Sequence, residues 1–287
     1  MNMISNSVVD RKKLFGISYK AVLKNPSRLF MAGILCIVIF TAIFGSMIAP
    51  HDPLETNLSL RLASPSRQYP LGNDALGRCL FSRILCGARA SIGLGFAIVM
   101  FSTLVGTIVG LISGYVGGLV DEFFMRIVDV FFSFPEIVAA MAVAGLMGPG
   151  TLNLLFALSV VSWMRYARLV RGISLSARER YYVKAARLSG VSGPAIMFRH
   201  VLPANIPSLI VVATIGLGKA VLGVSALGFL GFGVQPPSPE WGTLLMEGKD
   251  YILRAPHLSL YPGIAIMLSV LSFNLLGDTL RDTLAAD

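Results

Sequence analysis

Few residues in this chain could carry out chemistry, and they stand far apart. The sequence has 3 His and 3 Cys; each histidine is isolated, and the cysteines fit no metal-ligand spacing. Neither an HExxH nor a CxxC pattern occurs, and there is no GxxxxGK[ST] loop for the phosphates of ATP. Catalysis would need a nucleophile with a base, a carboxylate pair or clustered metal ligands. We therefore expect no catalytic residue, no metal site and no cofactor, and no ATP binding by the chain itself.

Lys219 is a charged residue in an unusual position. It lies near the middle of an apolar stretch, with Gly216, Gly218 and Gly223 beside it. An ionised group at the centre of a bilayer costs at least about 2.5 kcal/mol, so such a residue is a functional-site hypothesis. Either Lys219 pairs with a carboxylate, such as Glu136 or one on a partner subunit, or it faces a translocation path and meets an anionic group of a solute. We favour the pairing, because a buried charge needs its partner at all times.

Pro135 interrupts the apolar stretch that also contains Glu136. Its ring removes a backbone N–H, so we expect a kink and a freed carbonyl group. The kink either lines a translocation path or is only structural, and Pro135, Glu136 and Lys219 are our candidate path residues. Glu136 and Lys219 form no evident proton relay with Asp129, which argues against a proton-coupled carrier.

Membrane helices are the elements that must position these residues. Of 287 residues, 55% are hydrophobic and only 14% charged, and the mean hydropathy is +0.74. An ordinary soluble domain is about one quarter charged. The net charge of +9 would suggest nucleic acid in a soluble protein, but here the charges lie between long apolar stretches, which indicates a membrane protein without a nucleic-acid partner.

Six stretches are long enough, at about 20 residues, to span a bilayer. They are Leu29–Ala49, Ala90–Val120, Ile127–Met147, Leu152–Val170, Ile206–Gly231 and Leu258–Gly277. With a cytoplasmic N-terminus, most of the 24 Lys and Arg residues fall in interior segments, as the positive-inside rule requires. We therefore predict an all-α integral membrane protein with six transmembrane helices and both termini cytoplasmic.

The chain divides into three parts on this reading. Residues 1–28 form a cytoplasmic N-terminal segment, residues 29–89 the first transmembrane helix with an extracytoplasmic loop, and residues 90–287 a five-helix core. Within the core, Gly106, Gly110, Gly114 and Gly118 recur every four residues and form a strip that lets another backbone approach closely. We expect an internal packing seam here in preference to a homodimer motif.

An interior loop from Arg165 to Pro203 is unusually basic. We predict a helix over Ser176–Gly190, with Ser176 as N-cap, Glu179 as its capping-box partner and Gly190 as the stop. A second segment, Pro194–Val201, should end at Pro203. On composition alone, the first helix could equally lie along the membrane surface.

The same loop carries a familiar motif. The run from Tyr182 to Gly190 (YVKAARLSG), followed after nine residues by His200-Val-Leu-Pro203, resembles the EAA loop of permease subunits from binding-protein-dependent ABC importers. Lys184 stands where the motif usually has Glu. Other stretches resemble the second permease type of the dipeptide, oligopeptide and nickel family: LGNDALGR at 71–78, SR at 82–83, GARAS at 87–91, SFP at 133–135, LGFLGFGVQPP at 227–237, WG at 241–242 and GDTLRD at 277–282.

This resemblance implies a type I ABC importer transmembrane domain in a bacterial plasma membrane. Its partners would be a second homologous permease, two cytoplasmic ATPase subunits that hydrolyse the ATP, an extracytoplasmic solute-binding protein and the membrane lipid. The solute would be a peptide or a small molecule of similar size; a nickel chelate, a metallophore or glutathione is the alternative. The EAA loop, at 172–203, would couple to the ATPase through Lys184, Ala185, Ala186, Gly190, His200 and Pro203.

Two other classes of protein compete with this reading. A secondary carrier would show inverted repeats and a coupling-ion site at the midplane, and neither is visible in the hydropathy. A membrane-embedded enzyme would need the missing cluster of His, Asp or Cys. The exterior segment from Leu71 to Arg89 is expected to be ordered, and its Arg78, Arg83 and Arg89 either contribute to binding-protein docking or pair locally with Asp74 or lipid phosphates.

Overall fold

A computed structural model describes residues 26–285 of the chain. The expected N-terminal segment, residues 1–28, lies almost entirely outside these described residues. Within them the structure is helical and contains no β-strand. The all-α fold class is therefore confirmed.

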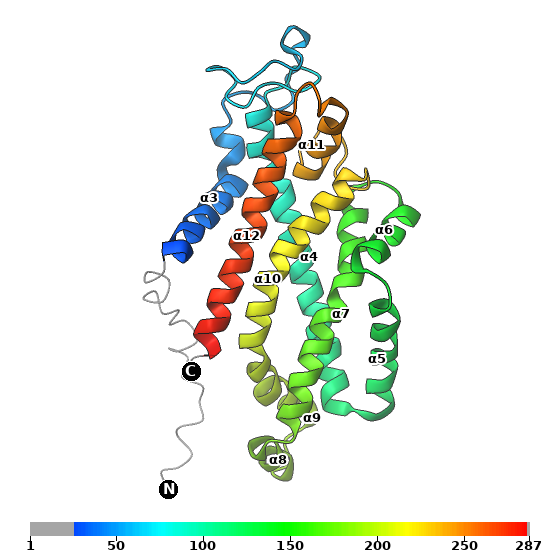
Figure 1. Cartoon of the computed structure of the whole chain (residues 1–287). Helices are drawn as coiled ribbons and strands as arrows, with labels where there is room; N and C mark the ends of the chain where they lie inside the picture. Colours follow the sequence, from blue (N-terminus) through cyan, green and yellow to red (C-terminus); the bar gives the residue numbers. More distant parts are fainter. Residues whose placement is uncertain (1–25, 286–287) are drawn as a thin grey trace.

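Long helices form the body of the molecule (Figure 1). They are α3 (Pro26–Ile48), α4 (Leu80–Val116), α7 (Thr151–Arg178), α10 (Leu202–Phe229) and α12 (His257–Ala285). Shorter helices connect or flank them: α5 (Gly118–Phe132), α6 (Glu136–Met147), α8 (Tyr181–Leu188), α9 (Gly193–Ile196) and α11 (Trp241–Gly248), with 3-10 turns η1 (Leu58–Leu60) and η3 (Lys249–Tyr251) and a π-helical turn η2 (Met197–Val201).

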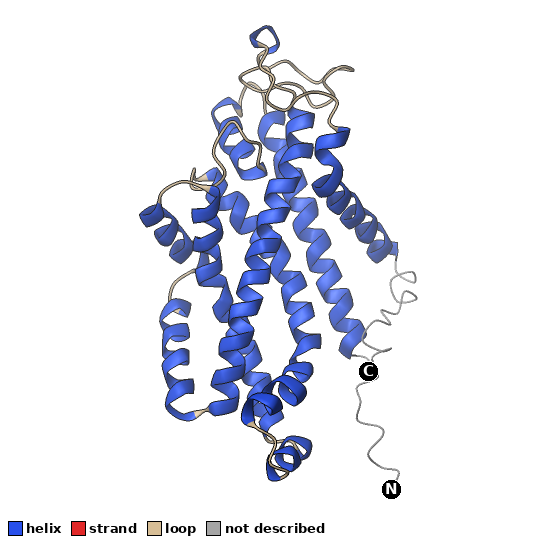
Figure 2. Cartoon of the chain, turned by 180° about the vertical axis from the view of Figure 1, so that it is seen from behind, coloured by secondary structure: helices blue, strands red, loops and turns tan. Residues whose placement is uncertain are grey.

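Helix α4 lies at the centre of the bundle. It packs against α7, α10 and α3, and α10 packs in turn against α12. Both views place α8 and α9 at one end of the bundle, with α11 and the segment 49–79 at the opposite end, here called the loop end (Figures 1 and 2). Helix α12 starts at the loop end and runs toward the α8 end, and α5 and α6 lie along one side of α7 (Figure 1).

The glycine strip of α4 is an internal seam, as predicted. A Cβ atom on Gly106 would lie 2.5 Å from the carbonyl oxygen of Trp163, and one on Gly110 would lie 2.5 Å from that of Ala167. Gly114 meets Arg171 of α7 in the same way, at 2.7 Å. Gly118 is outside the seam, because α4 ends at Val116 and nothing lies within 4 Å of its Cβ position.

The expected spans correspond to helices, with shifted ends. Among the described residues, four helical segments are long and apolar enough to cross a membrane, and a fifth crossing results if the bent pair α5–α6 counts as one. These are 29–48, 80–116, 193–229 and 257–283. Helix α7 contains the expected fourth span but carries Arg165, Arg168 and Arg171 along its length. Helix α4 begins ten residues before the expected Ala90, because the charge of Arg83 is neutralised there.

Pro135 does more than kink its span. Helix α5 ends at Phe132, α6 begins at Glu136, and the two axes are bent by 93°. Pro135 occupies the N-cap position of α6, where its missing N–H costs nothing, since the first N–H groups of a helix have no intrahelical partner. The break places the Glu136 side chain against α7.

Candidate functional site

Helix α7 (Thr151–Arg178) extends past the predicted N-cap of the helix expected over Ser176–Gly190. Ser176 lies inside α7, where its hydroxyl donates to the Gly172 carbonyl at 3.2 Å. The predicted start at Ser176 is therefore wrong, and the break comes at Glu179 and Arg180. The physical reason is that Ala177 continues the buried stripe of α7 against Val183 and its neighbours, so the helix gains by continuing.

Helix α8 has one buried face and one open face. Val183 is fully buried and Ala186 half-buried, and both belong to a core cluster with Ile196 and Val201. Tyr181, Ala185 and Leu188, four and three residues apart, lie on the exposed side. Tyr181 is 91% and Leu188 90% exposed. An open apolar face at the tip of a bundle is a typical interaction surface.

The ends of α8 are fixed by an ion pair and by a glycine. The Lys184 ammonium lies 3.0 Å from a carboxylate oxygen of Glu179, and this contact lowers the pKa of the Glu179 carboxyl below its ordinary value, with a smaller contribution from Arg178. Gly190 follows the helix with a φ of 77°. That conformation favours glycine, as expected for a stop at this residue.

His200 and Pro203 lie where the loop re-enters the bundle. His200 belongs to the π-helical turn, and its ring centroid is 6.3 Å from that of Tyr182. Pro203 does not end the second segment, contrary to our prediction. It lies in the first turn of α10, where a proline needs no N–H partner, and residues 193–229 form one continuous helical rod.

Ion pairs connect α7 to α5 and α6. Three arginines spaced three residues apart on α7 each meet one carboxylate: Arg171 meets Asp121, Arg168 meets Asp129, and Arg165 meets Glu136. Ser162 also donates to Glu136, at 3.1 Å. Arg165 thus takes the carboxylate of Glu136, and among the described side chains Lys219 has no ion pair with it; pairing of Lys219 with a carboxylate on a partner subunit stays a prediction.

Lys219, Glu136 and Arg165 share a cavity of about 580 Å³. Residues of α4, α6, α7 and α10 line it, and its walls are mainly apolar, including Ile98 and Leu158. Pro135 is not among the lining residues described for this cavity. The structure thus brings two of the three candidate path residues together.

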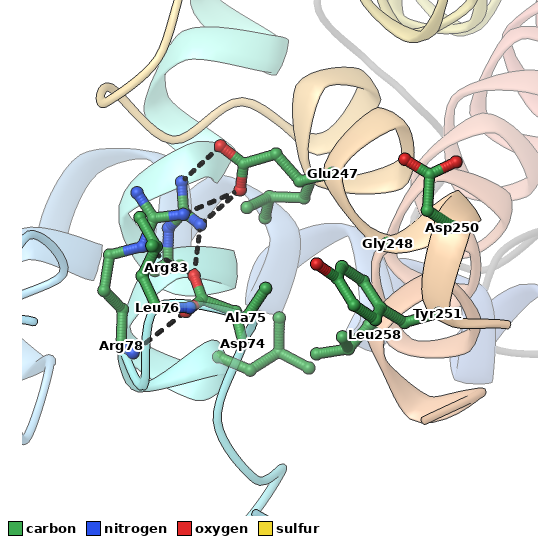
Figure 3. Close-up of a pocket in the computed structure, with 12 residues that line it drawn as sticks. Asp74, Ala75, Leu76, Arg78, Arg83, Glu247, Gly248, Asp250, Tyr251 and Leu258 are labelled. Carbon is green, nitrogen blue, oxygen red and sulfur yellow. Dashed lines mark hydrogen bonds and ion pairs between the residues drawn. The ribbon is translucent and has the colours of Figure 1, made fainter. Parts of the chain in front are cut away.

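A buried charge cluster ties the start of α4 to α11 at the loop end (Figure 3). Arg83 is 0% exposed, and its Nη1 lies 2.6 Å from Asp74 Oδ2. Arg78 Nε also lies 2.6 Å from Asp74 Oδ2, and its Nη2 is 3.0 Å from Glu247. Local pairing with Asp74 is confirmed for Arg78 and Arg83. Arg89 is exposed on α4.

Glu240 is a structural residue that the sequence analysis missed. Its side chain caps α11 by accepting from the backbone N–H groups of Gly242 and Thr243, at 2.9 and 3.0 Å, and from the Ser91 hydroxyl at 2.8 Å. Burial raises the pKa of the Glu240 carboxyl, while these donors act against that shift. An acidic residue directly before the Trp241-Gly242 motif was the available signal.

The described residues contain no group of three or more His, Cys, Asp or Glu side chains that could hold a metal ion. What the structure offers is an apolar helix face at one end, a charged cavity within the bundle and an ordered cluster at the loop end. The model of the inner membrane component of binding-protein-dependent transport systems matches residues 106–287.

This chain belongs to that family. The N-terminal membrane domain of oligopeptide transport permease C matches residues 14–65. The resemblance stated from the sequence motifs is therefore confirmed, and the chain is a multi-pass inner membrane protein of a transport system.

Relatives are similar over most of their length. The chain is 41% identical to the dipeptide transport system permease protein DppC of Alkalihalophilus pseudofirmus, over 93% of this chain and 88% of the relative. It is 41% identical to the di/tripeptide transport system permease protein DppC of Pseudomonas aeruginosa, over 87% and 84%. A glutathione transport system permease protein, GsiD of Pectobacterium atrosepticum, is also 41% identical, over 86% and 83%.

Proposed function

We propose that this chain is one of two permease subunits of an ATP-driven importer of short peptides. The main support for this proposal is the similarity of the chain, over most of its length, to permeases named for dipeptides, for di- and tripeptides and for glutathione. The partners are a second homologous permease, two ATPase subunits and a solute-binding protein. ATP hydrolysis takes place in the ATPase subunits, and this chain supplies no catalytic residue.

Glutathione transport is the second candidate function. It is favoured by the GsiD relative, whose identity to this chain equals that of the dipeptide permeases. A nickel chelate or a metallophore has no such support here. Peptides remain the broader class, since glutathione is itself a small peptide derivative.

The open face of α8 is the proposed ATPase contact. Its support is the exposure of Tyr181 and Leu188 and of the small residue Ala185 between them, at the tip of the bundle. Lys184, Ala186, Gly190, His200 and Pro203 hold this helix in place and join it to α10, whose rod also carries Lys219. A push on α8 would therefore act directly on a helix that lines the cavity.

The proposed topology has six crossings with both termini in the cytoplasm. It counts α5–α6 as one broken crossing and α7 as another, in addition to the four apolar helices. Arg165, Arg168 and Arg171 of α7 are compatible with a crossing because each has a carboxylate partner on α5 or α6. The α8 end is then cytoplasmic, and the loop end, with the charge cluster, faces the binding protein. The divisions 1–28, 29–89 and 90–287 follow this topology.

Co-purification tests the proposal. The chain would be expressed with its neighbouring genes, purified through an affinity tag on this subunit and examined for bound ATPase subunits. Vesicles containing the complex should then take up a labelled dipeptide when ATP and the binding protein are supplied. A chain that purifies without ATPase subunits and drives uptake alone would be a secondary carrier, and the proposal would fail.

A further inference from the structure

The cavity between α4, α6, α7 and α10 carries more positive charge than its own residues neutralise. Its volume of about 580 Å³ falls within the range of roughly 300–1,000 Å³ that small-molecule sites occupy. Its charged lining residues are Glu136, Arg165 and Lys219. Glu136 is engaged by Arg165 and by Ser162. Among side chains 29–283, Lys219 forms no ion pair, so the cavity carries one uncompensated positive charge.

Close packing of α10 holds Lys219 in the cavity. A Cβ on Gly216 would lie 2.2 Å from the Tyr166 hydroxyl oxygen, and one on Gly223 would lie 3.1 Å from Leu158. These glycines therefore let α10 lie directly against α7 on either side of Lys219. The lysine is exposed in the isolated subunit and lines a cavity with largely apolar walls. Within a membrane-spanning bundle, a lone cation needs an anionic partner.

Lipid phosphates are out of reach for this cation. Lys219 lies 17 residues after Leu202 and 10 residues before Phe229, the two ends of α10. At 1.5 Å per residue, these distances are about 25 Å and 15 Å along the helix. A lysine side chain that extends from the middle of a span does not bridge either distance. The anion must therefore come from a solute in the cavity or from a partner subunit.

We propose that Lys219 binds the terminal carboxylate of a peptide as the peptide passes through the bundle. This inference rests on the proposed function, because it assumes a peptide-sized solute. The apolar walls then contact the side chains of the peptide. Glu136 already neutralises Arg165, so one carboxylate from the solute is enough to neutralise the remaining positive charge, that of Lys219.

Protection of a cysteine from a thiol reagent tests the proposal. The complete importer would carry this subunit with Cys36, Cys79 and Cys86 replaced by alanine and with Leu222→Cys, a lining position three residues from Lys219. In nanodiscs without binding protein, N-ethylmaleimide labels this cysteine at a measurable rate. We expect dialanine to slow labelling at least threefold, and its C-terminal amide to slow it much less. Leu253→Cys, 96% exposed and outside the cavity, is the control whose rate stays constant.

Variants of Lys219 decide between the possible anions. Lys219→Met should remove the protection by dialanine and Lys219→Arg should retain it. Equal protection by dialanine and its amide, equal protection in Lys219→Met, or no protection at all would overturn the inference. An assembled importer in which Leu222→Cys resists labelling, or loss of assembly in Lys219→Met, would overturn it in favour of a carboxylate on the partner permease. Failure of the ATPase subunits to co-purify would instead contradict the proposed function.

Discussion

Arg83 and Glu247 are 164 residues apart in the sequence, and Arg83 Nη1 lies 2.5 Å from Glu247 Oε2. The contact joins the first turns of α4 to α11, and Asp74 completes it from the preceding loop (Figure 3). With Arg78, the cluster contains two cations and two carboxylates, so it is neutral as a whole. Such a balanced cluster lets a long helix begin with a fully buried arginine.

Arg83→Met should therefore destabilise the subunit strongly. Removing one member of a buried ion pair leaves its partners uncompensated and costs about 3–5 kcal/mol. The midpoint of thermal unfolding of the purified complex measures this loss. Arg126→Met is the matched control, because Arg126 pairs with Glu122 while its side chain is 77% exposed, and exposed pairs contribute only about 0–1 kcal/mol. Equal midpoints for the two variants would contradict the structural role of the cluster.

Ala185→Trp should block coupling without harming the fold. Ala185 is on the exposed face of α8, so a large side chain there has room in the isolated subunit but not in a close contact with an ATPase. We expect normal assembly into membranes and loss of peptide uptake and of solute-stimulated ATP hydrolysis. Uptake at the wild-type rate would show that this face does not dock.

Ala186→Trp is predicted to fail for a different reason. Ala186 packs against the core cluster that includes Val183 and Ile196 of its own chain, so the larger side chain overpacks this core at a cost of about 1–3 kcal/mol. A lower unfolding midpoint in the detergent-solubilised subunit measures that cost. A normal midpoint with lost coupling would place Ala186 in the ATPase contact with Ala185.

Gly110→Ala should separate α4 from α7. The new Cβ would lie 2.5 Å from the carbonyl oxygen of Ala167 and 2.7 Å from Val170 Cβ, and such overpacking costs about 1–3 kcal/mol. Gly93→Ala on the same helix is the control, because nothing lies within 4 Å of its Cβ position; helix propensity alone should make that variant about 1 kcal/mol more stable. Unfolding midpoints that move in the same direction would refute the seam.

Glu240 should make stability depend on pH. Burial raises the pKa of its carboxyl above the ordinary value of 4.5, so the folded chain retains a proton that the unfolded chain releases. The stability from this group is complete below pH 4.5 and is lost as the pH rises through the raised pKa. Glu240→Gln removes this titration. The unfolding midpoint of the variant should therefore rise relative to that of the wild type as the pH rises. Glu55→Gln, at an exposed position, is the matched substitution to be measured beside it.

The helices and the family follow from the sequence alone. Apolar stretches of about 20 residues are long enough to cross a bilayer as helices. In lipid, the backbone N–H and C=O groups are all hydrogen-bonded only in a helix or a closed β-barrel, so such stretches specify membrane helices. The four-residue glycine repeat predicts a close helix contact, since it leaves one face of the helix without side chains and so lets the backbone of any neighbouring helix approach. The EAA-like run and its companion motifs predict the permease family, because each is a contiguous run of residues that can be identified without knowing the fold.

Pairing between distant side chains was decided only by the tertiary structure. Sequence placed Lys219 and Glu136 in different spans and could not show that Arg165 takes the carboxylate, because that depends on the 93° break that turns α6 against α7. The capping prediction at Ser176 failed for a similar reason: burial of Ala177 against Val183 outweighs a local capping preference. Local patterns thus determine which helices form, whereas the partner of each charge is set by helix packing, which no local pattern encodes.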